Sequence, residues 1–106
     1  MDTSDLIGAE LDAAVARACS ELIAKIDDRG VWVRRPRYDC AFNIDLYSPS
    51  TDWSQGGPII EKERIALLIW PAKGFTWAGQ VWGHADPHHG ETPLIAAMRA
   101  FVASKK

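Results

Sequence analysis

The sequence has few cysteines and no long apolar segment, and both absences narrow the kinds of protein it can be. Cys19 and Cys40 are the only cysteines among 106 residues, and the acidic start, Met-Asp-Thr-Ser-Asp, lacks the basic region of a secretory signal. We therefore expect a cytoplasmic protein with two reduced thiols, of which Cys19 falls in a helical pattern consistent with burial. The longest apolar run, residues 65–70, is far shorter than the roughly 18 residues of a membrane helix, so no membrane association is expected.

The chain also lacks an excess of positive charge. It has 12 Lys and Arg residues against 14 Asp and Glu residues, a net charge of −2. Binding to a phosphate backbone depends on a basic surface, so nucleic acid is an unfavoured partner. The local basic cluster, Arg34, Arg35 and Arg37, could face an anionic partner, but Asp39 and Asp45 partly balance it and favour a solvated loop.

What the sequence does contain is the ordinary composition of a folded domain. Apolar residues make up 47% of the chain and charged residues 25%, which is enough apolar material for a packed core. A length of 106 residues is typical of one domain. We expect residues 1–106 to form a single globular domain with an ordered core at about residues 5–104.

The spacing of apolar residues predicts a helix near each end of the chain. Leu11, Val15, Leu22 and Ile26 share one helical face, which predicts a helix over residues 8–27 that ends before a glycine. A second helix should begin at Thr92-Pro93, an N-cap residue followed by a first-position proline. Its apolar stripe would consist of Leu94, Ile95, Met98, Phe101 and Val102.

The middle of the chain has the composition of short strands. Residues 31–33 and 38–47 suit strands at a sheet edge, the second with Phe42, Ile44 and Leu46 on one half-buried face. Residues 65–70 are apolar on both faces, which predicts a strand covered on both sides. They should form an antiparallel hairpin with residues 75–82.

Three details complete the predicted fold. Pro58 suits the first position of a short helix over residues 58–63. Trp70 and Trp77 are candidates for the core. Gly79, in the second hairpin strand, indicates a bulge or a close approach by another element. The sequence thus predicts an α+β fold, with a small antiparallel sheet centred on the hairpin 65–82, packed by an N-terminal and a C-terminal helix and one short extra helix.

Two segments of the sequence resemble a known family. They are Pro49-Ser-Thr-Asp-Trp-Ser-Gln-Gly-Gly-Pro-Ile-Ile-Glu-Lys-Glu-Arg-Ile65 and Gly90-Glu-Thr-Pro-Leu-Ile-Ala-Ala-Met-Arg-Ala-Phe-Val-Ala-Ser-Lys105, and both are similar to the phage NinX-like family of small phage and prophage proteins of unknown function. Residues 6–18 look like that family's opening helix, whereas residues 28–48 and 83–89 do not carry the resemblance. The resemblance implies an intracellular, phage-derived accessory protein and brings no catalytic residues.

One cluster has the residue types of a metal site: His84, Asp86, His88 and His89. Two or three of them could hold zinc or nickel, and nearby carboxylates could supply a paired acid and base. A small metal-dependent or acid/base enzyme using this segment is therefore the alternative function. Pro87 and the irregular spacing leave the geometry unspecified, so we expect a solvated loop, with no metal, cofactor or catalytic residue.

The segment 49–57 is the candidate binding loop, because its two flanking prolines, Pro49 and Pro58, limit its freedom. Trp53 is either a recognition anchor or a ring folded back onto the hairpin. The first functional hypothesis is a non-enzymatic module for an unknown protein partner, monomeric or weakly associated since neither a coiled coil nor a long exposed strand is evident. The predicted partner-binding residues are Asp52, Trp53, Gln55, Gly56 and Gly57.

Overall fold

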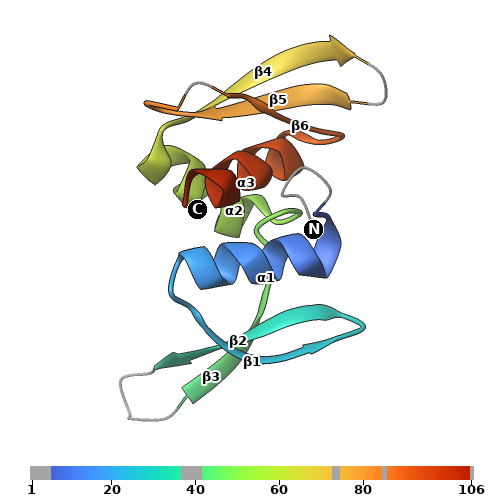
Figure 1. The fold of residues 1–106 in the computed structure, drawn as a ribbon. Helices are drawn as coiled ribbons and strands as arrows, with labels where there is room; N and C mark the ends of the chain where they lie inside the picture. The colour runs from blue at the N-terminus through green and yellow to red at the C-terminus, as the bar shows by residue number, and fades with distance from the viewer. Residues whose placement is uncertain (1–5, 37–41, 73–74, 85, 106) are drawn as a thin grey trace.

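The computed structural model describes residues 6–36, 42–72, 75–84 and 86–105. Within them the chain forms three helices and two three-stranded antiparallel sheets, so the predicted α+β class is confirmed (Figure 1). The elements are α1 (Gly8–Ala18), β1 (Leu22–Asp27), β2 (Gly30–Pro36), β3 (Phe42–Tyr47), α2 (Trp53–Glu63), β4 (Ile65–Ala72), β5 (Phe75–Val81), β6 (His88–Gly90) and α3 (Pro93–Ser104).

The two sheets lie at opposite ends of the molecule, and the helices lie between them (Figure 1). The N-terminal sheet has the order β1-β2-β3 and packs on α1, while the C-terminal sheet has the order β4-β5-β6 and packs on α3. Helices α1 and α3 also contact each other. This stacking makes the molecule elongated, with extents of 47 × 28 × 23 Å.

The predicted helix over residues 8–27 is wrong in its second half. Helix α1 ends at Ala18, and Ser20 adopts a left-handed conformation with φ of 59°. Leu22–Asp27 instead form β1, which joins β2 through a turn at which Asp27 pairs with Gly30. Gly30 has φ of 134°, which side chains rarely allow. Pairing with β2 therefore overrides the local helical spacing, since propensity is only a weak preference.

The core lies where the helices meet the inner faces of the sheets. Leu11 and Val15 of α1, Val31 and Val33 of β2, and Met98 of α3 are fully buried there. Close packing of α3 on the C-terminal sheet depends on two glycines. A Cβ at Gly79 would lie 2.8 Å from the Ala96 oxygen, and one at Gly90 would lie 2.6 Å from the Ala96 nitrogen. The close approach predicted at Gly79 is confirmed.

The predicted hairpin is confirmed, but its first strand is not covered on both sides. Strands β4 and β5 pair from Ile65↔Val81 onwards, and β4 is the edge of its sheet. Leu68 and Ile69 are 42% and 75% exposed. These two residues are consecutive, so their side chains point to opposite faces of the sheet, and neither face of β4 is fully covered at this point. The outer edge of β4 is also unpaired in the described strands, because β5 is the central strand. Trp77 is half-buried, and the side chain of Trp70 lies outside the described residues.

Two other predictions of burial differ from the structure. The predicted alternation in β3 is wrong for the side chains that the structure describes: Ile44, 53% exposed, and Asp45 are both exposed, and the buried residue next to the core is Tyr47. Cys19 follows the last residue of α1 and is exposed, because the helix ends just before it. Cys40, Arg37 and the side chain of Arg35 lie outside the described residues, and Arg34 is exposed.

Candidate functional site

The candidate binding segment is largely helical rather than a loop. Helix α2 begins at Trp53, five residues before Pro58, because Asp52 caps it: the Asp52 Oδ1 accepts hydrogen bonds from the Ser54 amide at 2.9 Å and the Ser54 hydroxyl at 2.7 Å. Gly56 was predicted to lie in the binding loop and to contact a partner. Instead, a Cβ at Gly56 would lie 2.4 Å from the Pro49 oxygen, so glycine serves close packing here.

Gln55 holds the start of α2 against the end of β3. Its Nε2 donates to the Leu46 oxygen at 2.9 Å, and its Oε1 accepts from the Ser48 amide. The intervening turn is closed by the Asp52 amide, which donates to the Ser48 oxygen at 2.8 Å. These bonds fix the direction in which α2 leaves the turn and therefore the position of its first residue.

A buried carboxylate connects the same turn to α1. Asp12 is 5% exposed, and its Oδ1 accepts a hydrogen bond from the Ser50 amide at 2.9 Å. Burial raises the pKa of Asp12 above its ordinary value, while the hydrogen bond from the Ser50 amide opposes that rise. The turn is thus held from two directions, by Gln55 and by Asp12.

Trp53 is the first residue of α2, directly after this fixed turn, and 53% of its surface is exposed. It borders a pocket of about 220 Å³ that the start of α2 shares with the start of α3. At α3, the Thr92 hydroxyl accepts from the Ile95 amide at 3.1 Å, which confirms the predicted cap. The Trp53 pocket, as we call it, is lined by Ser50, Thr51, Trp53, Thr92, Pro93, Leu94 and Ile95.

The five predicted partner-binding residues therefore play different parts. Asp52, Gln55 and Gly56 make the internal contacts that build the start of α2. Trp53 is exposed, and a Cβ at Gly57 would meet nothing within 4 Å. The structure brings the five together on one helical turn and its cap, but only Trp53 presents a large side chain to solvent.

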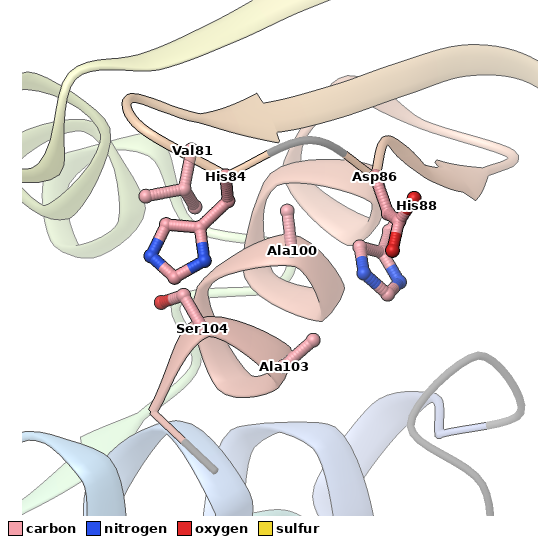
Figure 2. Close-up of a pocket in the computed structure, with 7 residues that line it drawn as sticks. All are labelled: Val81, His84, Asp86, His88, Ala100, Ala103 and Ser104. Carbon is pink, nitrogen blue, oxygen red and sulfur yellow. The ribbon is translucent and has the colours of Figure 1, made fainter.

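The histidine segment is partly a strand, and its side chains do not all converge. His88 and His89 belong to β6, where consecutive side chains point to opposite faces. A pocket of about 280 Å³ against α3 includes His84, Asp86 and His88 in its lining, but not His89. Figure 2 shows His84 near one end of this pocket, beside Ser104, and Asp86 with His88 near the other end. Among the described residues, no three His, Cys, Asp or Glu side chains are placed to share a metal ion.

Arg99 is a residue whose role the sequence analysis missed. It is 5% exposed within the apolar stripe of α3, where its Nε donates to the Leu6 oxygen at 2.9 Å and its Nη1 donates to the His89 oxygen at 2.8 Å. A charged residue inside the run Ala-Met-Arg-Ala-Phe was the signal that could have revealed it. Arg99 joins the start of the chain to β6.

Comparisons with known proteins place the chain in a family. No curated protein gave a significant match. No helix in the described part of the chain combines the length and apolarity needed to cross a membrane. The family model described as Bacteriophage P22, NinX matches residues 2–105, nearly the whole chain. The two segments that carry the resemblance, 49–65 and 90–105, meet where α2 contacts α3. The chain belongs to the Bacteriophage P22 NinX family.

Proposed function

We propose that this protein is a non-enzymatic module that binds a protein partner through Trp53 and the adjoining Trp53 pocket. Membership in a bacteriophage family supports a phage-derived protein, and we propose that it acts in the cytoplasm of the host as an accessory protein. The observation that carries the proposal is the exposed Trp53 ring on a braced helix start.

The hydrogen bonds that hold the start of α2 in place matter because binding costs conformational entropy. A tryptophan supplies a large contact area with few rotatable bonds, and such residues dominate the energy of many protein interfaces. Asp52 and Gln55 already fix the backbone beneath the ring. A partner would therefore not have to order this segment, which favours affinity.

The pocket indicates what kind of contact a partner would make. Pro93, Leu94 and Ile95 supply apolar lining, and three hydroxyl residues, Ser50, Thr51 and Thr92, supply the rest beside Trp53. A partner's apolar side chain could enter next to the ring, where the exposed Thr51 offers a hydroxyl group, whereas Ser50 is buried and the Thr92 hydroxyl caps α3. The alternative enzyme would use the pocket that His84, Asp86 and His88 help to line (Figure 2), but in the described part of the chain no three such side chains are placed to share a metal ion.

The test compares two exposed tryptophans. Trp53→Ala should weaken capture of the partner from host lysate by roughly 2 kcal/mol, about thirtyfold, once the captured protein has been identified and titrated. Trp82→Ala is the matched control, because Trp82 is 74% exposed and lies outside the pocket. Both variants should unfold at nearly the same denaturant concentration as the parent. Normal binding by Trp53→Ala, or a loss shared equally by Trp82→Ala, would overturn the proposal.

A further inference from the structure

Strand β4 has an open edge. Among the strands that the structure describes, it lies at the outside of the C-terminal sheet and pairs with β5 alone. In the described part of the chain, no backbone hydrogen bond outside the helices and sheets involves any residue of β4. A row of backbone N–H and C=O groups on the outer side of β4 is therefore available to another strand.

The other edge strands carry features that discourage such pairing. Strand β1 has Lys25 and a register irregularity between Ile23 and Lys25. Strand β3 has Asp45, and β6 is only 3 residues long. Charges, bulges and short length are the usual protections of a sheet edge. Strand β4 is 8 residues long and contains no charged residue.

The unprotected part of β4 is well defined. Its pairing with β5 is regular from Ile65 to Ile69, after which the register shifts and Pro71 follows. At the other end, Arg64 adopts a left-handed conformation with φ of 53° as the cap of α2. Within this regular stretch Leu68 and Ile69 expose much of their apolar surface. The edge is thus a short, neutral segment bounded on both sides.

We propose that β4 pairs antiparallel with β4 of a second copy of this chain, giving a continuous six-stranded sheet. A two-fold axis near Leu67 would set Ile65 opposite Ile69 of the second copy, and Ala66 opposite Leu68. An identical strand fits because its regular stretch has the same length and the same two boundaries. Neither strand carries a charge that would repel the other or lose water.

The dimer should be weak. Five paired residues bury much less than the roughly 800 Å² per partner of a standard stable interface. The sequence predicted a monomer or weak associate because neither a coiled coil nor a long exposed strand was evident, and a weak dimer through the short edge of β4 falls within that prediction. We place the dissociation constant in the micromolar range or above, so that association depends on protein concentration. This proposal is independent of partner binding at Trp53.

Sedimentation velocity over a concentration series tests the proposal. The parent should shift reversibly from monomer to dimer. Leu68→Lys and Ile69→Lys each place a charge on the edge and should raise the dissociation constant at least about tenfold. Ile44→Lys is the matched control, because Ile44 is similarly exposed on the other sheet and should leave the dissociation constant unchanged. A parent that stays monomeric up to near-millimolar concentration would contradict the dimer.

Hydrogen exchange on the unsubstituted protein provides a second test that does not depend on how the variants fold. Raising the concentration should slow exchange of alternate amides between Ile65 and Ile69, because those amides gain partners. Slowing confined to another surface would show a different interface and overturn the proposal. The proposal would also be overturned if the protein stayed monomeric and hydrogen exchange of the β4 amides slowed only when an unrelated β-strand peptide was added.

Discussion

The carboxylate of Asp12 and the backbone amide of Ser50 meet at 2.9 Å, although they are 38 positions apart in the sequence. Both residues are buried, with 5% and 2% of their surfaces exposed. The bond ties α1 to the turn that leads into α2. It therefore connects the core helix to the support of Trp53, and it places an ionisable group where water is excluded.

Asp12 should make the protein less stable as pH rises from acidic to neutral. Because burial raises its pKa in the folded protein above the ordinary value of 3.8, the folded state favours the protonated form. The stabilisation is complete below the unfolded pKa and is lost as pH rises through the folded pKa. Asp12→Asn keeps an acceptor for Ser50 but cannot ionise. The free energy of unfolding of Asp12→Asn, measured with urea, should increase relative to that of the parent as pH rises from acidic to neutral. A difference that stays constant with pH would contradict the prediction.

The adjacent glycines of α2 should differ in how much stability their replacement by alanine costs. Gly56→Ala places a Cβ 2.4 Å from the Pro49 oxygen and 2.6 Å from the Leu94 Cδ2, so we expect a loss of about 1–3 kcal/mol from overpacking. Gly57→Ala is the control, because its Cβ would meet nothing within 4 Å. It should change stability by less than about 1 kcal/mol, because the better helix propensity of alanine is opposed by Pro58, which disfavours the helical conformation in the residue before it. Equal effects in denaturant unfolding would show that packing at Gly56 is unimportant.

The two hydrogen bonds that Arg99 donates should contribute substantially to the free energy of unfolding. Arg99→Met fills a similar volume but leaves the Leu6 and His89 carbonyls without their donor, which should cost about 2–4 kcal/mol. Arg99→Lys keeps the charge but lacks the planar fork that reaches both carbonyls, so we expect an intermediate loss. Thermal unfolding of the two variants gives the measurement. A stable Arg99→Met protein would mean that water replaces the guanidinium without penalty.

Cys19 should react readily in the folded protein. It is exposed at the end of α1, so a thiol reagent should label it without denaturant. Titration in denaturant without reductant should find two thiols, since we expect Cys19 and Cys40 both to be reduced. Cys19→Ser should remove the labelling seen in the folded state, and peptide mapping identifies the labelled site. Slow labelling at Cys19 would show that its surface is covered in solution.

The elements predicted correctly are those specified by neighbouring residues. Thr92 and Pro93 mark the start of α3, and the strand composition of residues 65–70 and 75–82 marks the paired strands β4 and β5. Leu22 and Ile26 fit a helix as well as a strand, so only their pairing with β2 decides between the two. Gly56 is ambiguous for the same reason, because its role depends on Pro49 and Leu94.

For the candidate site, the sequence predicted where the segment lies in the chain but not how its side chains are oriented. The prolines and the tryptophan drew attention to residues 49–57, but local sequence does not say which of these side chains face inward. Gln55 points to Leu46 and Asp52 caps α2, whereas Trp53 remains exposed. Those outcomes depend on where β3 ends relative to α2, and that relation is set by tertiary packing.

The placement of α1 and α3 between the sheets has a consequence for the order of folding. Each sheet forms from strands that are close in sequence, within residues 22–47 or 65–90, and contacts of this kind form early because their loops are short. The bond from Arg99 to Leu6 closes a loop of 93 positions. We expect the helices to dock last, so Arg99→Lys should mainly speed unfolding and leave the folding rate almost unchanged in stopped-flow measurements. A slower folding rate would instead put the meeting of the two chain ends in the folding nucleus, with the sheets forming around it.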